Sequence, residues 1–191
     1  MTMLWHRKTG PILASSMTDY SMKEVFNMQL TRRKESHQAL TPAVELYHNG
    51  TRYAQCYDYH AHIQAAGGEN VEIITVADLV SVSQHSPERR ISCRIRYTLG
   101  RGYVAFRIQL SGAWTSQCRF VLPLIGRHAY GCTPMKNGLR IVSQKGSFLV
   151  KTTNEMQDPK PIFFLTPGLE AWSCHLMPDI TGKIEVTLYI E

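Results

Sequence analysis

The sequence lacks the hydrophobic runs and motifs that identify most membrane, exported and cofactor-binding proteins. No stretch reaches the roughly 18 consecutive apolar residues of a membrane span, so no membrane partner is expected. The first eight residues, MTMLWHRK, contain no apolar run of the kind found in a secretory signal. A Walker loop, a dinucleotide-binding glycine pattern, a GxSxG elbow and an HExxH pair are also missing. Nothing in the chain therefore amounts to a complete catalytic motif.

Cysteine is sparse and irregularly spaced. The five cysteines are an odd number, and none forms a CxxC pair: Cys56, Cys93, Cys118, Cys132 and Cys174. This spacing predicts neither a zinc knuckle nor a dense disulfide framework. Buried free cysteine is the expected state for most of the five.

Acidic residues are fewer than basic ones. With 21 Lys and Arg against 15 Asp and Glu, the net charge is +6. A positive surface favours acidic partners such as anionic polysaccharide, nucleic acid or membrane headgroups. The basic residues are scattered along the sequence, and the only dense run is Arg32-Arg33-Lys34. Since no recognition helix or zinc-finger spacing accompanies the charge, nucleic acid is not an expected partner.

What the sequence does contain is strict alternation of apolar and polar residues. It occurs in residues 91–97 (ISCRIRY), 103–110 (YVAFRIQL) and 184–190 (IEVTLYI). Because successive side chains leave a strand on opposite faces, this period predicts half-buried β-strands. The chain is thus expected to be mostly antiparallel sheet, with one face buried and one face wet.

The spacing of strands and turns predicts one domain over residues 1–191. About ten to twelve strands, separated by Gly, Pro and Asn turns, are typical of an antiparallel β-sandwich of jelly-roll or supersandwich type. Asn49-Gly50 predicts a tight hairpin. Asp158-Pro159 is expected to break the chain before a strand at residues 162–165. At most one short helix is expected, near residues 21–26, where SMKE has capping-box spacing.

Asp58, His60 and His62 form the sharpest group of chemically active residues. If residues 57–63 form a strand, these three side chains project from one face and could bind a divalent metal such as zinc. Alternate side chains on a strand lie about 6 to 7 Å apart, which is wide for neighbouring ligands of one ion. The alternative is a polar outer face with two exposed imidazoles, and no cofactor is otherwise expected.

Aromatic residues offer two further hypotheses. Trp114, flanked by loop-like residues, could stack on a sugar ring, although large aromatics are more often part of a core. A Tyr–His pair can carry out β-elimination on a uronic acid, one group removing the ring proton and the other protonating the leaving oxygen. Tyr57, Tyr59 and His60 are adjacent in sequence, but only the two tyrosines would share a strand face.

The order of several segments resembles the C-terminal β-region of heparinase II/III-like polysaccharide lyases. The segments are Trp5-His6-Arg7, Gly10-Pro11, residues 14–20 (ASSMTDY), residues 24–29, residues 96–99 (RYTL), residues 120–125 (FVLPLI) and residues 181–186 (TGKIEV). The resemblance implies an acidic polysaccharide substrate, cut by β-elimination between a β-sandwich and an upstream α/α-toroid. This chain has no helical repeats for a toroid and lacks the family's His-rich opening stretch. No catalytic residue of the family therefore transfers to a numbered position here.

The resulting expectation is a β-sandwich domain that supports or binds acidic polysaccharide for such a lyase and is not catalytic alone. Two alternatives stay open: a stand-alone carbohydrate-binding module around Trp114, and a metal-dependent jelly-roll enzyme around Asp58, His60 and His62. A fragment of a secreted lyase would be periplasmic or extracellular; otherwise the absence of a signal would favour the cytoplasm.

Overall fold

The computed structural model describes residues 2–6, 10–14, 42–127, 129–143, 146–162 and 169–191. Within them, 15 strands form three antiparallel sheets. The helices of this part are two single 3-10 turns, η2 (Gln55–Tyr57) and η3 (Thr115–Gln117). Neither is long or apolar enough to cross a bilayer. The expected all-β fold is confirmed, whereas the short helix expected near residues 21–26 and the basic run at residues 32–34 lie outside the described residues.

An eight-stranded sheet forms one layer of the sandwich, in the order β10-β11-β12-β15-β8-β7-β6-β5. Its strands are β5 (His62–Ala66), β6 (Val71–Asp78), β7 (Ile91–Gly100), β8 (Tyr103–Gly112), β10 (Ala129–Met135), β11 (Gly138–Ser143), β12 (Gly146–Thr152) and β15 (Lys183–Ile190). The alternating segments of the sequence form its centre. In β7 every second residue from Ile91 to Tyr97 is buried, as the alternation predicts.

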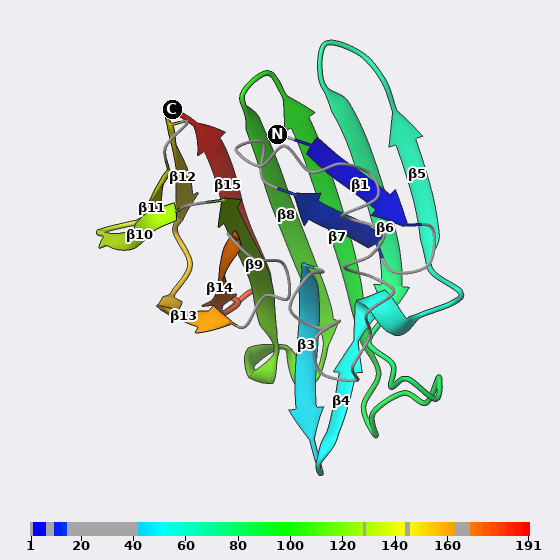
Figure 1. Cartoon of the computed structure of the whole chain (residues 1–191). Helices are drawn as coiled ribbons and strands as arrows, with labels where there is room; N and C mark the ends of the chain where they lie inside the picture. Colours follow the sequence, from blue (N-terminus) through cyan, green and yellow to red (C-terminus); the bar gives the residue numbers. More distant parts are fainter. Residues whose placement is uncertain (1, 7–9, 15–41, 128, 144–145, 163–168) are drawn as a thin grey trace.

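A five-stranded sheet forms the second layer, in the order β13-β14-β9-β3-β4. Its strands are β3 (Ala43–His48), β4 (Thr51–Ala54), β9 (Arg119–Arg127), β13 (Met156–Ile162) and β14 (Leu169–Leu176). A separate hairpin of β1 (Thr2–His6) and β2 (Gly10–Ala14) contacts β9. Figure 1 shows this hairpin and β3 on the near side of the molecule, in front of the large sheet.

The core lies between the two layers. Tyr97 of β7 and Phe106 of β8 meet edge to face with ring centroids 5.5 Å apart, and Phe106 lies 5.6 Å from Phe120 of β9. The second contact joins the large sheet to the small one. Aromatic pairs of this kind contribute about 0.5–1.5 kcal/mol beyond their buried area, so this chain of three rings ties the layers together.

The turn at Asn49-Gly50 is confirmed, and both residues adopt the positive φ values (48° and 72°) that such hairpins need. The break expected at Asp158-Pro159 is wrong, because β13 continues through both residues. Proline is tolerated there because β13 is an edge strand and its pairing with β14 shifts register between Gln157 and Lys160. The strand count also exceeds the expected ten to twelve. Part of the excess is edge strands such as β5, whose five residues are all exposed and so show no alternation of burial.

Candidate functional site

The outer face of the eight-stranded sheet gathers four basic residues on three neighbouring strands. Arg94 and Arg96 lie on β7, Arg107 on β8 and Lys183 on β15, all on the side opposite the core. Cross-strand pairing places Arg94 in one row with Gln109 and Lys183. Arg96 shares the next row with Arg107 and Glu185. We call these four residues the cationic face.

Arg96 and Arg107 are direct cross-strand neighbours of like charge. Such a pair destabilises a sheet, so folding alone does not favour it. Arg107 has one weak partner: its Nε lies 4.0 Å from a carboxylate oxygen of Glu185, and both side chains are about 60% exposed (62% and 61%). Neither Arg94 nor Arg96 forms an ion pair with any residue of the described ranges. Their guanidinium groups are therefore available to carboxylate or sulfate groups, which they can bind in bidentate fashion.

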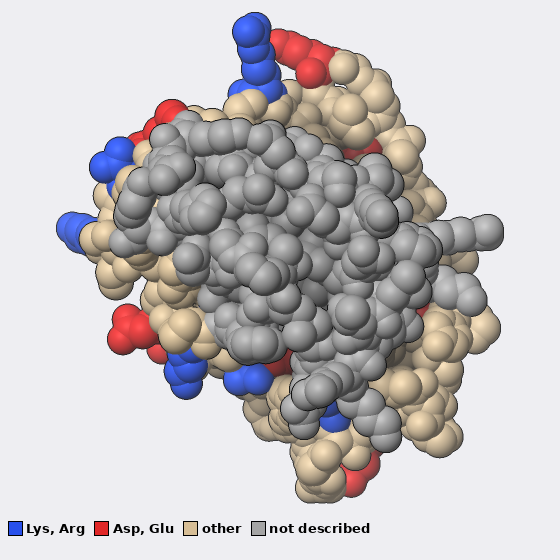
Figure 2. Space-filling view, viewed as in Figure 1, with Lys and Arg blue, Asp and Glu red and all other residues tan. Residues whose placement is uncertain are grey.

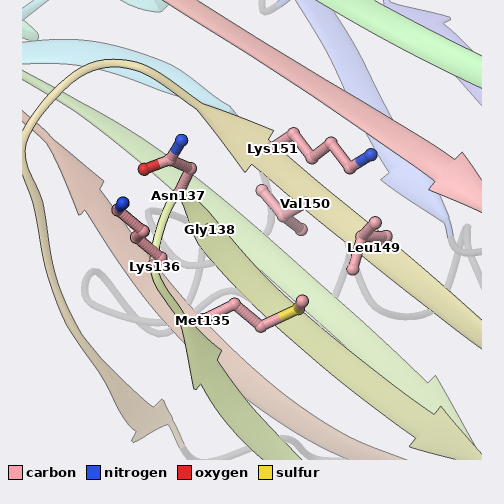
Figure 3. Close-up of a pocket in the computed structure, with 7 residues that line it drawn as sticks. All are labelled: Met135, Lys136, Asn137, Gly138, Leu149, Val150 and Lys151. Atoms are coloured by element: carbon pink, nitrogen blue, oxygen red, sulfur yellow. The ribbon is translucent and has the colours of Figure 1, made fainter.

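A pocket of about 330 Å³ lies on the same side of the sheet, and it begins in the row of residues next to that of Arg96 and Arg107. It is lined by Met135, Lys136, Asn137, Gly138, Leu149, Val150 and Lys151, as Figure 3 shows. Lys151 is paired with Thr187 of β15 on one side and with Gly138 of β11 on the other. The register thus makes the pocket an extension of the surface that bears the cationic face.

Tyrosines border this surface between the arginines and the pocket. Tyr189 of β15 lies opposite both Tyr103 of β8 and Leu149 of β12. The two tyrosine rings are 6.2 Å apart, and the Lys151 ammonium lies 5.2 Å from the Tyr189 ring centroid. Aromatic rings beside cations suit sugars, because one face of a pyranose is apolar and its substituents are polar or charged.

The opposite surface, on the outer side of the five-stranded sheet, has a different organisation. There the charges are paired and buried around Glu45, which is 4% exposed. Its carboxylate accepts hydrogen bonds from Arg52 at 2.5 Å and from Arg119 at 2.8 Å, and Arg52 also donates to the Tyr57 hydroxyl. Figure 2 shows both positive and negative side chains of the described residues around the margin of this near side. The network around Glu45 is therefore a structural crosslink of β3, β4 and β9.

The condition for a shared face of Asp58, His60 and His62 is not met, because residues 57–63 do not form one strand. Tyr57 ends the turn η2, and β5 begins only at His62. The Asp58 carboxylate accepts backbone N–H bonds at 2.8 Å from His60 and from Asp78, so the side chain closes a local turn that competes with strand formation. In the described part of the chain, no group of three or more His, Cys, Asp or Glu side chains has a metal-binding arrangement. The metal site stays a prediction that this geometry does not favour.

The Tyr–His pair considered for elimination gains no support from the burial of its members or from the pKa of Tyr57. Tyr59 and His60 are exposed, whereas Tyr57 is partly buried against Arg52. Burial raises the pKa of the Tyr57 phenol, and the nearby Arg52 offsets this only in part. A tyrosine that removes a proton must do so as phenolate, so a raised pKa disfavours Tyr57 in that role.

Trp114 is half-buried at the start of η3 and packs against the edge of the core. Its ring lies 4.4 Å from the His48 ring, and the Arg89 guanidinium lies 5.7 Å from its centroid. Both contacts occupy area that a sugar platform would need. Sugar stacking on Trp114 therefore stays a prediction.

The comparisons with known proteins identify the family of the chain. The family model for the ulvan lyase C-terminal domain matches residues 1–191. The chain belongs to this family.

A broad-specificity ulvan lyase of Formosa agariphila is 34% identical over 83 residues. That match covers 44% of this chain but only 12% of the relative's length. No solved structure matches the chain. The comparisons thus support the C-terminal domain of a polysaccharide lyase and do not single out the heparinase II/III-like group.

The sequence analysis did not predict the cationic face, because it treated the basic residues as scattered. The signal was nevertheless present. Alternation puts Arg94 and Arg96 on the polar side of their strand and Arg107 on the polar side of the next strand. The short turn at Arg101-Gly102 pairs the two strands, so these polar sides form one face of the sheet. Counting back from that turn pairs Arg96 with Arg107, so the register of the hairpin was the missing step.

Proposed function

We propose that this domain binds an anionic polysaccharide on its cationic face, on behalf of a polysaccharide lyase whose eliminating residues lie elsewhere in the enzyme. The observation that supports this most is the opposed pair Arg96 and Arg107. Two guanidinium groups that repel each other in the free domain are both neutralised when an anionic chain crosses the strands. A ligand thus removes a cost that the folded domain otherwise bears.

The spacing of the cationic face fits a polymer better than a small anion. Neighbouring strands lie about 4.8 Å apart and alternate residues of one strand about 6.8 Å apart, so the four cations spread over a broad patch. A polysaccharide with repeated carboxylate or sulfate groups contacts several of them at once, and multivalent contact strengthens binding that is weak at each point. Exposed pairs of this kind are screened by salt, so binding should weaken as ionic strength rises.

Ulvan is the first polysaccharide to test, because the matched relative is called an ulvan lyase. The catalytic role falls to another part of the enzyme in this proposal, because burial raises the pKa of the Tyr57 phenol and so disfavours it as the group that removes the proton. An upstream α/α-toroid, expected from the sequence resemblance, is the partner we propose for that role.

The test is electrophoresis of the domain through native gels with and without ulvan, using dextran as a neutral control. The variant Arg94→Ala/Arg96→Ala should lose about 0.5–1 kcal/mol of binding free energy per arginine, and so bind ulvan about 5- to 30-fold more weakly. The matched control, Arg89→Ala/Lys160→Ala, removes two exposed positive charges outside the cationic face and should be retarded almost as strongly as the wild type.

Stability separates loss of binding from loss of fold. Because the substitution at position 96 relieves the repulsion with Arg107, the Arg94→Ala/Arg96→Ala variant should unfold at or above the wild-type temperature. Equal weakening by both double variants would show that net charge alone governs binding, and the proposal would fail. Equal retardation in ulvan and dextran gels would also contradict it.

A further inference from the structure

The pocket near the turn between β10 and β11 has the form of a site for one sugar residue. Its volume of about 330 Å³ lies at the lower end of the roughly 300–1,000 Å³ range of small-ligand pockets. The hollow exists because Gly138 contributes no side chain between Met135 and Lys151, its partners on either side. A Cβ at Gly138 would lie 1.7 Å from the carbonyl oxygen of Val150, so no other residue fits this backbone.

The turn that forms the pocket is held firmly to the neighbouring strand. The carbonyl oxygen of Asn137 accepts a hydrogen bond from the Thr152 amide at 3.0 Å. The Thr152 hydroxyl in turn donates to the Glu185 carbonyl of β15 at 2.6 Å. These bonds join the turn at Asn137 to β12, and β12 to β15, so the turn is a fixed part of the sheet.

The groups around the pocket combine cationic, amide and apolar chemistry. In Figure 3, Lys136 and Asn137 lie at one end of the pocket and Lys151 at the other, while Met135 and Leu149 form the apolar side. Within the described residues no acidic side chain lines the pocket. Two ammonium groups beside an apolar wall favour a ligand that is anionic at one end and apolar over one face, which describes a uronic acid ring.

We infer that this pocket binds one uronate residue, with the carboxylate paired to one of the two ammonium groups, that of Lys136 or that of Lys151, and the apolar ring face against Met135 and Leu149. The inference deepens the proposed function and rests on it, since the same surface would bind the anionic chain. The cationic face then binds a run of the polysaccharide by charge, and the pocket recognises a single sugar by shape and charge together.

The experiment is a titration of the ¹⁵N-labelled domain with glucuronate, followed by amide chemical shifts, with glucose as the neutral control. Glucose differs in carrying a hydroxymethyl group where glucuronate carries a carboxylate. We expect glucuronate, and not glucose, to shift the amides of residues 135–138 and 149–151. Affinity in the millimolar range is expected for one exposed sugar.

Three variants make the result specific. Lys136→Met/Lys151→Met should weaken glucuronate binding at least about fivefold. Lys160→Met removes an exposed charge outside this surface and should leave the shifts unchanged. Arg94→Ala/Arg96→Ala should also leave them unchanged while it loses retention in ulvan gels.

The outcomes for the pocket and for the proposed function are distinguishable. Shifts that are absent at residues 135–138, or that are equal for glucose, overturn the pocket even if the arginine variant still loses ulvan binding. Shifts at the pocket in a domain that ulvan gels do not retard would leave the pocket established and refute the proposed function.

Discussion

Replacing Glu45 by alanine should cost more stability than any other single change of a charged residue discussed above. Its carboxylate is almost fully buried and accepts hydrogen bonds from Arg52 and Arg119. The Arg52 side chain is itself only 8% exposed, so the substitution leaves its guanidinium group buried without its carboxylate partner. Removing one partner of a buried ion pair typically costs about 3–5 kcal/mol.

The measured quantity is the midpoint of thermal unfolding. For a chain of this length, about 1 kcal/mol corresponds to roughly 2–4 °C, so Glu45→Ala should lower the midpoint by about 6–20 °C. Glu45→Gln retains an acceptor oxygen and should lose less, about 1–3 kcal/mol.

Glu185→Ala is the matched control for this prediction. Its ion pair with Arg107 is 4.0 Å long and both side chains are exposed, so the expected loss is at most about 1 kcal/mol. If Glu45→Ala and Glu185→Ala unfold within about 2 °C of each other, the network around Glu45 does not crosslink the five-stranded sheet.

Three further predictions concern other parts of the fold. Gly138→Ala should lower the free energy of unfolding by more than about 2 kcal/mol in a denaturant titration, because φ is +150° and the new Cβ would meet the Val150 carbonyl. In the control, Gly67→Ala, the new Cβ would have no atom within 4 Å, so the free energy of unfolding should change by at most about 0.5 kcal/mol. Burial of Asp78 opposes its ionisation, but hydrogen bonds from Arg90 and Ser92 outweigh this and lower its pKa below the ordinary 3.8. The ionised Asp78 carboxylate therefore stabilises the fold above its ordinary pKa, and this stabilisation is lost as the pH falls through the lower folded-state pKa. Asp78→Asn should flatten the acid side of a curve of unfolding free energy against pH, and an unchanged curve would contradict the assignment. Burial raises the pKa of the Cys118 and Cys174 thiols to about 12. Ellman's reagent should therefore modify the half-buried Cys132 before either of them in the native protein. Faster reaction at Cys118 or Cys174 would show that these thiols are not buried in the core.

The parts of the fold that sequence could predict are those where one local rule acts alone. Alternation identified β7, β8 and β15 because each has one face in the core, and Asn49-Gly50 identified a turn because few other pairs adopt positive φ readily. The predicted break at Asp158-Pro159 was wrong because a strand accepts proline when it lies at the edge of a sheet, and the sequence does not show which strand lies there. That order is a property of the assembled sheet.

The candidate site depends on register and on contacts between distant segments. Arg96 and Arg107 are neighbours only through the pairing of β7 with β8, and Lys183 joins them from 76 positions beyond Arg107 through β15. Asp58 shows the converse: a local carboxylate-to-backbone turn overrides a strand that a run of side chains had suggested. Side-chain type alone could not distinguish these two outcomes.

Protection of individual arginines against phenylglyoxal, read by peptide mass spectrometry with and without ulvan, tests the central claim most directly. The account predicts that ulvan slows modification of Arg94, Arg96 and Arg107, while the exposed Arg89, which lies outside the cationic face, reacts as fast as before. Protection that is absent at all three arginines of the cationic face, or that is equal at Arg89, would contradict the assignment of this surface as the polysaccharide-binding face.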